Sequence, residues 1–245
     1  MITSVVGNRS AFHLSTSYGY QPFSRLAATN SATYSYDNNG NLISKTIGGA
    51  TTQYSWDFEN RLKQVTIPGG PTVNYKYDAL GRRIQRSTSN DDLLNFVYDG
   101  QDVIEDLDGD GNVVTSYING PGIDNKIRRT DDANGNLYYL TDHLGSTIAL
   151  TDDGGNVVEG IGYDSFGNST GSELTRYTYT GREFDSDTGL YYYRARWYDA
   201  QVGRFGFKEF VPITGVHDSH KCRQHFVRKQ RTARGQPQEL FVEFD

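Results

Sequence analysis

Three aspartates lie at the spacing of a calcium-binding loop. In DLDGDGN, Asp106, Asp108 and Asp110 occupy positions 1, 3 and 5, and Gly111 follows at position 6. Carboxylate oxygens at this spacing suit a calcium ion, but such a loop also needs a bidentate glutamate at position 12. Position 12 here is Tyr117, and strand-forming residues flank the loop. The pattern therefore favours an Asp/Gly-rich hairpin turn over a calcium site.

A second group of residues has the chemical types of a hydrolytic triad. Asp142, His143 and Ser146 lie within five positions of one another in the segment TDHLGST. A triad is assembled in space from separate elements, so adjacency along the chain does not indicate one. We predict a structural turn at this segment and no catalytic residue.

The C-terminal segment gathers three of the five histidines and the single cysteine. His217, His220, Cys222 and His225 lie within nine residues, and six lysines and arginines fall between positions 221 and 234 with no acidic residue among them. A metal-dependent nuclease needs a metal ion beside a basic surface. However, the spacing fits neither usual zinc motif, and about forty residues are few for a catalytic domain. A weakly structured tail is favoured, with a nuclease remnant as the alternative, and no metal or cofactor site is predicted.

The composition indicates many short strands and tight turns. The 245 residues include 27 Gly and 18 Tyr, but only 1 Met, 1 Cys and 6 Pro. Residues 1–205 hold 17 basic and 25 acidic residues, a charge of −8, which argues against nucleic-acid binding by this part of the chain. No run of 18 apolar residues predicts a membrane span, and no signal peptide is visible at the N-terminus.

A repeat of 20 or 21 residues organises the body of the chain. Each copy begins aromatic-x-aromatic-Asp, and the first three continue with a few residues, Gly or Asn followed by Asn or Arg, and then an apolar residue. The last aromatic and the aspartate of the four copies are Tyr36 and Asp37, Trp56 and Asp57, Tyr77 and Asp78, and Tyr98 and Asp99. The two aromatics share one strand face, the aspartate can cap a turn, and Gly or Asn supplies a positive φ. We therefore predict a β-hairpin for each copy, paired with its neighbours in one twisted, curved sheet.

Residues 189–205, GLYYYRARWYDAQVGRF, hold five aromatics within eight positions. If this segment is one strand, its alternate residues face opposite sides, with Tyr191, Tyr193, Ala195 and Trp197 on one face and Tyr192, Arg194, Arg196 and Tyr198 on the other. One face would be large and apolar, and the other would pair guanidinium groups with tyrosine rings. Such a strand needs a sheet to join and a layer to cover it.

These motifs resemble a known family. The repeat copies resemble the YD repeat, and TYTGREFDSDTG at 178–189 together with the aromatic segment resembles the RHS repeat-associated core of bacterial Rhs proteins. In that family an Asp-Pro pair normally follows the core, and this chain has none, which favours a fragment or truncated member. The resemblance implies an all-β architecture with YD/RHS hairpin repeats over 1–100, the RHS core over 101–205 and a variable tail over 206–245.

The resemblance also implies a role. Rhs proteins form a β-shell that encloses a variable C-terminal toxin used in bacterial competition, so this chain is expected to be a structural, non-enzymatic part of such a shell, secreted or in the cell envelope. The expected partners are the rest of a larger shell or a toxin domain, and no cofactor is expected. By the same analogy the closing layer would be made by Tyr191, Tyr193, Arg194, Arg196, Trp197, Tyr198 and Asp199, and the core signature also includes Gly203, Arg204 and Phe205.

Two other functions stay open at the level of sequence. YD repeats are also linked to attachment to cell-wall carbohydrate, and a tyrosine-rich sheet face suits stacking on sugar rings. The tail could also be the remnant of a metal-dependent nuclease toxin. A stripe of Tyr and Trp facing solvent would favour the carbohydrate-binding module, whereas aromatic rings facing a covered interior would favour the shell.

Overall fold

The computed structural model describes residues 18–21, 25–206, 227–231 and 237–241. The chain divides into two compact units, Met1–Lys208 and Glu209–Asp245, and each is described by itself. In the described part of the chain, no helix has the length and apolar character that crossing a membrane would require.

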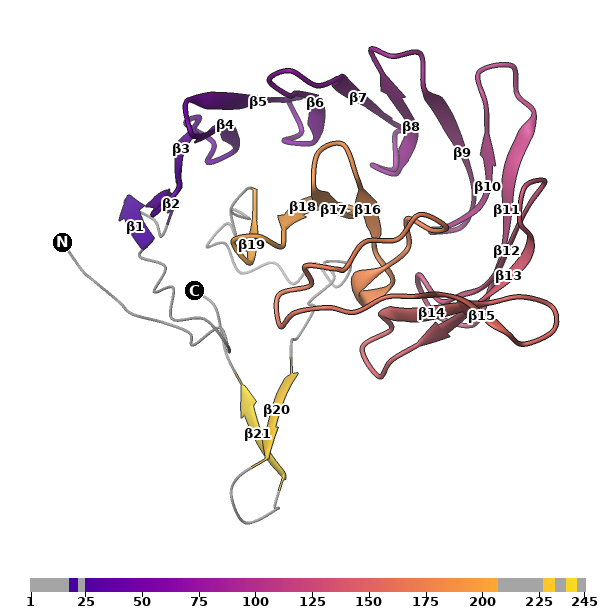
Figure 1. The fold of residues 1–245 in the computed structure, drawn as a ribbon. Coiled ribbons are helices and arrows are strands. Elements are labelled where there is room, and N and C mark those ends of the chain that lie inside the picture. The colour runs from indigo at the N-terminus through magenta and orange to yellow at the C-terminus, as the bar shows by residue number, and fades with distance from the viewer. Residues whose placement is uncertain (1–17, 22–24, 207–226, 232–236, 242–245) are drawn as a thin grey trace. The chain divides into compact units, whose positions relative to one another are not determined.

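One antiparallel sheet of fifteen strands makes up most of the first unit, and consecutive strands are always neighbours. Its strands are β1 (Tyr18–Gln21), β2 (Arg25–Thr29), β3 (Ala32–Tyr36), β4 (Leu42–Ile47), β5 (Ala50–Trp56), β6 (Leu62–Thr66), β7 (Thr72–Tyr77), β8 (Arg83–Thr88), β9 (Leu93–Asp99), β10 (Asp102–Leu107), β11 (Val113–Asn119), β12 (Lys126–Asp131), β13 (Gly135–Thr141), β14 (Thr147–Thr151) and β15 (Val157–Gly160). The sheet curves around a smaller group of strands that come later in the chain (Figure 1). The predicted all-β class and curved antiparallel sheet are confirmed.

The repeat aspartate shapes the turn that closes each hairpin. Asp78 Oδ1 accepts hydrogen bonds of 2.9 Å from the backbone N–H groups of Leu80 and Arg82. Gly81 has a φ of 79°, and its N–H donates to the carbonyl of Asp78. The pairing register shifts by one residue beside this turn, before Tyr77. This is a turn followed by a left-handed residue and a β-bulge, which suits the twist of a hairpin.

The same capping contact recurs along the chain. An aspartate carboxylate accepts from the N–H four residues later at Asp37, Asp57, Asp108, Asp142, Asp152 and Asp164. DLDGDGN and TDHLGST are therefore hairpin turns, as predicted. Among the described residues no group of three His, Cys, Asp or Glu side chains could hold a metal ion. Asp99 differs from the other repeat aspartates, because it pairs with Asp102 across the two residues Gly100 and Gln101.

The second repeat aromatic joins one hairpin to the one before it. Tyr77 Oη donates to the carbonyl of Leu62 at 2.8 Å, and Tyr98 Oη donates to the carbonyl of Arg83 at the same distance. The Arg82 guanidinium bonds to Asp78 and lies 4.9 Å from the centre of the Tyr98 ring. Each hairpin is thus fixed to the next by side chains as well as by the strand ladder.

The described part of the second unit is a two-stranded antiparallel ladder. Strand β20 (Val227–Arg231) pairs with β21 (Pro237–Phe241). The tail predicted to be weakly structured therefore contains one strand pair. His217, His220, Cys222 and His225 lie outside the described residues.

Candidate functional site

A second sheet of four strands lies inside the curve of the large sheet (Figure 1). It consists of β16 (Glu183–Asp185), β17 (Leu190–Tyr193), β18 (Arg196–Asp199) and β19 (Arg204–Phe205), paired in that order. We call these four strands the inner layer. It contains every residue of the predicted closing layer and core signature except Arg194 and Gly203, which lie in its turns.

The prediction of one strand through the aromatic segment was wrong. The chain reverses at Arg194 and Ala195, so Tyr193 pairs with Arg196 in a hairpin, and Arg194 has a φ of 58°. Residues that pair across a ladder share a face, so Tyr192 and Trp197 now lie on the same side of the layer. A single strand would have placed these two rings on opposite sides.

The face of the inner layer that carries Tyr192 and Trp197 packs on the large sheet. Their rings form one hydrophobic cluster with inward residues of β2 to β7, including Leu62 and Tyr75. The ring centres of Tyr75 and Trp197 are 4.5 Å apart, and only 2% of the surface of Trp197 is exposed. This face is the apolar contact between the two sheets.

The opposite face is also covered. Tyr191, Tyr193 and Tyr198 form a cluster with Tyr179 of a short helix, η2 (Tyr179–Gly181), and with Tyr163. The surface of Tyr191 is fully buried, and its hydroxyl donates to the carbonyl of Gly167 at 2.9 Å. The inner layer is therefore a middle layer, enclosed between the curved sheet and the chain segment that follows β15.

The end of the inner layer is fixed to the large sheet by both side-chain and backbone contacts. Arg204 donates to Tyr20 Oη on β1 at 2.7 Å. Within the inner layer itself, the ring centre of Phe205 lies 3.9 Å from the Arg196 guanidinium. Gly203 has a φ of 68°, and a Cβ there would lie 2.6 Å from the ring of Phe166. The carbonyl of Gly206 then accepts a 2.9 Å hydrogen bond from the N–H of Leu42.

A buried arginine occupies the centre of the interface between the sheets. Arg83 is 2% exposed, its guanidinium lies 4.5 to 5.6 Å from four aromatic ring centres, and its Nη2 bonds to Glu183 Oε2 at 2.5 Å. Arg176 Nε also bonds to Glu183, at 2.7 Å. Burial alone would raise the pKa of Glu183, but the charges of Arg83 and Arg176 outweigh it and lower the pKa below its ordinary value.

Two further ion pairs join basic residues of the large sheet to acids of the inner layer. Arg86 Nε bonds to Asp185 Oδ2 at 2.9 Å, and Tyr75 Oη donates to the same oxygen at 2.7 Å. Lys45 Nζ bonds to Asp199 Oδ2 at 2.7 Å. Burial favours the neutral form of Asp185, yet the hydrogen bond and charge of Arg86 lower its pKa.

The signs of the charges are reversed further along the sheet. Arg176 reaches Asp106 on β10, with Nη2 2.8 Å from Oδ1. Arg182 and Arg194 both bond to Asp124 in the turn before β12, Arg194 at 2.8 Å. Burial, which outweighs the two arginines, raises the pKa of Asp124. We call residues 161–206, which follow the large sheet and include the inner layer, the inner chain. In this half the acids belong to the large sheet and its turns, and the arginines to the inner chain.

Lys126, at the start of β12, is held by oxygen acceptors and aromatic rings. Lys126 Nζ donates to the carbonyl of Val103 and to Asn119 Oδ1, both at 2.7 Å, and lies within 4.8 Å of the ring centres of Tyr117 and Tyr177. Burial lowers the pKa of Lys126 to about 8. The described residues of the site thus hold buried charges and aromatic rings together.

The sequence is similar to proteins whose function has been described. The Teneurin YD-shell family matches residues 6–224, which is most of the chain. The chain belongs to the YD-shell family. It is 38% identical over 191 residues to the tRNA nuclease WapA of Bacillus subtilis, covering 74% of this chain and 8% of WapA. It is also 27% identical over 237 residues to the double-stranded DNA deaminase toxin A of Burkholderia cenocepacia, covering 81% of this chain and 16% of the toxin.

Solved structures of Tc toxin proteins share this fold. The Tc holotoxin pore of Photorhabdus luminescens matches with a TM-score of 0.51 at 17% sequence identity, covering 78% of this chain and 14% of the compared one. A crystal structure of TcdB2-TccC3-Cdc42 matches with a TM-score of 0.50 at the same identity. These likenesses concern the fold alone. The family model and the similarity to WapA confirm the assignment to the RHS and YD-repeat proteins, and the chain spans less than a tenth of the length of WapA.

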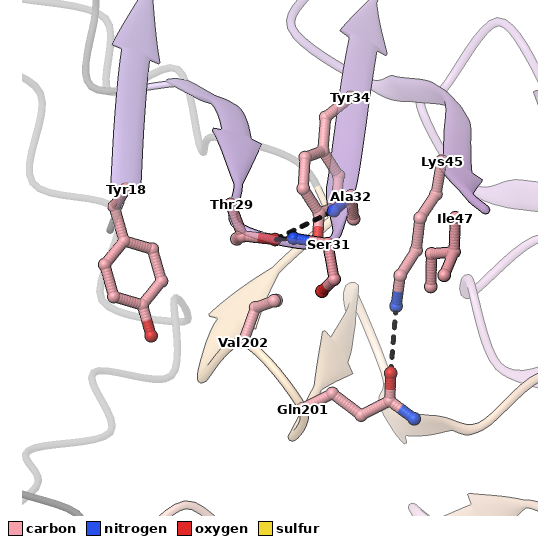
Figure 2. Close-up of a pocket in the computed structure, with 9 residues that line it drawn as sticks. All are labelled: Tyr18, Thr29, Ser31, Ala32, Tyr34, Lys45, Ile47, Gln201 and Val202. Carbon is pink, nitrogen blue, oxygen red and sulfur yellow. Dashed lines mark hydrogen bonds between the residues drawn. The ribbon is translucent and has the colours of Figure 1, made fainter. Parts of the chain in front are cut away.

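A small cavity lies in this YD-shell chain where the inner layer meets the first strands of the sheet (Figure 2). Its volume is about 170 Å³, and its walls include Tyr18, Tyr34, Lys45 and Val202. Figure 2 shows Lys45 reaching across to Gln201, whose Oε1 accepts at 3.3 Å. Because Lys45 is already bonded to Asp199, the cavity presents no unbalanced charge.

Most charged residues of the interface were missing from the sequence prediction, which named Arg194 and Asp199 in the closing layer and Asp106 only as a possible calcium ligand. The residues missed are Lys45, Arg83, Arg86, Asp124, Arg176, Arg182, Glu183 and Asp185. One signal was available. Arg83 stands where the two preceding YD copies have Leu42 and Leu62, so it is a charge at a position that the repeat otherwise keeps apolar.

Proposed function

We propose that this chain is a structural, non-enzymatic part of an Rhs-type β-shell that encloses or presents a variable C-terminal toxin in competition between bacteria. The observation that supports the proposal is the direction of the aromatic residues. Tyr34, Tyr54 and Tyr75 point from successive hairpins into one covered cluster, where Tyr192 and Trp197 meet them. The repeats therefore serve to enclose a layer of the same chain.

The proposed partner is the rest of a larger YD-repeat shell or a toxin domain carried with it, and the proposed location is outside the producing cell. Both come from the relatives, which are toxins and nucleases by name and much longer than this chain. The nuclease and deaminase activities in those names belong to whole proteins, of which this chain matches 8 to 16%.

The carbohydrate-binding alternative has less support. It calls for a row of Tyr and Trp rings facing solvent, because sugar rings stack on exposed aromatic faces. Among the described residues Tyr20 is the one exposed Tyr or Trp, at 41%, and its hydroxyl is bonded to Arg204. The nuclease alternative concerns His220 and Cys222, which lie outside the described residues.

Two assays on the purified full chain test the proposal. Limited proteolysis with mass spectrometry should leave a resistant body that ends near residue 206, because the inner layer is enclosed up to Gly206. Transfer RNA and duplex DNA incubated with the chain and Mg²⁺, Mn²⁺ or Zn²⁺ should stay intact. Metal-dependent cleavage that His220→Ala or Cys222→Ala abolishes would show that the chain is an enzyme. Early cutting inside β16 to β19 would contradict the enclosed layer.

A further inference from the structure

The inner face of the large sheet repeats itself along its first hairpins. Tyr34, Tyr54 and Tyr75 occupy equivalent inward positions on β3, β5 and β7, and Phe96 does so on β9. Aromatic packing alone would therefore offer the inner layer several similar docking positions, each one hairpin apart. Something besides ring packing must select one of them.

The residue directly across the ladder from each of these rings differs in charge. Tyr34 pairs with Lys45, Tyr54 with Val65, Tyr75 with Arg86 and Phe96 with Asp106. The side chains at these four equivalent positions on successive hairpins are therefore, in chain order, positive, neutral, positive and negative. We propose that this order of charges sets the register in which the inner layer docks on the repeats. The proposal deepens the structural role proposed above and rests on it.

The inner chain carries the complementary order. Asp199 bonds to Lys45, Asp185 bonds to Arg86, and Arg176, which lies just before β16, bonds to Asp106. The neutral Val65 is fully buried in the apolar cluster. Every charge in the row is therefore met by an opposite charge, and the neutral position is met by apolar atoms.

A slip of one hairpin toward the C-terminal half would break this match. Asp199 would face Val65, and Asp185 would face Asp106, so a buried carboxylate would lose its partner and another would meet a like charge. A slip in the other direction would bring Arg176 to Arg86 and Asp185 to Val65. Unpaired or like charges in a buried site oppose both alternatives, which is how specificity against wrong pairings arises.

Other contacts agree with the same register without forming part of the row. Arg83 and Lys126 both lie near Glu183, and their charges help to lower the pKa of Glu183. Arg182 and Arg194 bond to Asp124 at the acidic end. The inner face is therefore basic beside β4 and β8 and acidic beside β10 and the turn before β12.

The register can be read with engineered cysteine pairs in a full chain that carries Cys222→Ser. Ile47 and Val202 line the same cavity, so Ile47→Cys with Val202→Cys should form a disulfide in the native register. Ile67 lies two residues after Val65, just as Ile47 lies two residues after Lys45, so the two isoleucines occupy equivalent positions one hairpin apart. Ile67→Cys with Val202→Cys should therefore report a slip of one hairpin. The yields are measured by peptide mass spectrometry without reduction.

One charge reversal should shift the inner layer by one hairpin toward the C-terminal half of the large sheet. Asp106→Arg opposes Arg176 in the native register and would attract Asp185 in the slipped one, so the ratio of slipped to native disulfide should rise at least tenfold. Asp110→Arg makes the same change of charge at an exposed residue of the adjacent turn and should leave the ratio unchanged. Equal ratios in two folded variants would overturn the proposal.

A neutral variant covers the case in which Asp106→Arg does not fold. Asp106→Asn leaves Arg176 bonded to Glu183 and removes the like charge that Asp185 would meet in the slipped register, so the ratio of slipped to native disulfide should rise, whereas Asp110→Asn should leave it unchanged. An unchanged ratio in folded Asp106→Asn would also overturn the proposed charge order. These outcomes are separate from those of the functional proposal, since metal-dependent cleavage of nucleic acid would refute the non-enzymatic role without changing which disulfide forms.

Discussion

Replacement of Arg83 by leucine tests how the centre of the interface is held together. Leu42 and Leu62 stand at this position in the two preceding hairpins, so leucine is compatible with the local strand and bulge. The change would leave the carboxylate of Glu183 buried with Arg176 as its remaining bonded arginine. We expect Arg83→Leu to be destabilising although it makes the repeat more regular.

The size of the effect follows from burial. Removal of one partner of a buried ion pair costs about 3–5 kcal/mol, because the other charge is left in a poorly solvated site. For a chain of this size that loss lowers the melting temperature by roughly 6–20 °C. Glu183→Leu should cost about as much, because Arg83 would keep only ring contacts. When both residues are leucine no charge is stranded, so the double variant should lose far less than the two single variants together.

The measurement is a double-mutant cycle by urea unfolding, followed by tryptophan fluorescence, with size-exclusion chromatography of each variant. A coupling energy of about 3 kcal/mol is expected between Arg83 and Glu183, because Arg83 Nη2 lies 2.5 Å from Glu183 Oε2. Additive effects would show that the two residues act independently. That result would refute the reasoning that Arg83 stabilises the interface through its ion pair with Glu183. It would indicate that Arg83 acts through its packing against aromatic rings.

Three further outcomes can be measured on the same chain. Trp197→Ala should lower the free energy of unfolding by about 3–5 kcal/mol, because a fully packed ring is lost, whereas Phe58→Ala should have almost no effect because Phe58 is 90% exposed. Asp78→Ala removes two backbone hydrogen bonds and should cost about 1–3 kcal/mol in the same assay, more than Asp99→Ala, since Asp99 sits in a different turn. Asp185 has a lowered pKa in the folded chain, so its contribution to stability is present at neutral pH and should be lost as the pH falls below about 4. Asp185→Asn should reduce this fall in melting temperature at acid pH. An unchanged pH profile would count against the Arg86 contact.

The hairpins could be predicted from sequence because the forces that shape them are local. Asp78 bonds to N–H groups two and four residues ahead, and Gly81 supplies the positive φ in the same turn. Every contact needed for the turn lies within five consecutive residues, so the motif is complete in the sequence. The pairing of neighbouring hairpins then follows from the antiparallel meander, in which each strand pairs with the next.

The reversal inside the aromatic segment could not be predicted in the same way. Arg194 and Ala195 are not turn-forming residues, and a positive φ at a residue with a side chain is unfavourable. Arg194 is held there by contacts far away in sequence, with Asp124 and with the carbonyl of Gln101. Since five aromatics in eight residues look like a strand, only the tertiary contacts reveal the hairpin.

The ion pairs were hidden for a related reason. Lys45 and Asp199 are 154 positions apart, and Arg83 and Glu183 are 100 apart. The odd charge at Arg83 is visible when the repeat copies are aligned, but 30 acidic residues are spread along the chain as possible partners. The sequence thus indicates that the inward arginine needs an acidic partner, but only the fold identifies which acid it is.

The hairpin turns and the docking of the inner layer are linked through the backbone. The bulge that follows each capped turn leaves an N–H group that can reach the interior. At Leu42 this N–H donates to the carbonyl of Gly206, and at Arg83 it donates to Tyr192 Oη at 3.1 Å. A buried N–H group without an acceptor is costly, so such a bulge favours an inner chain that places an acceptor opposite its N–H group. The capping motif that makes the repeat therefore also prepares the inner face for the layer it encloses.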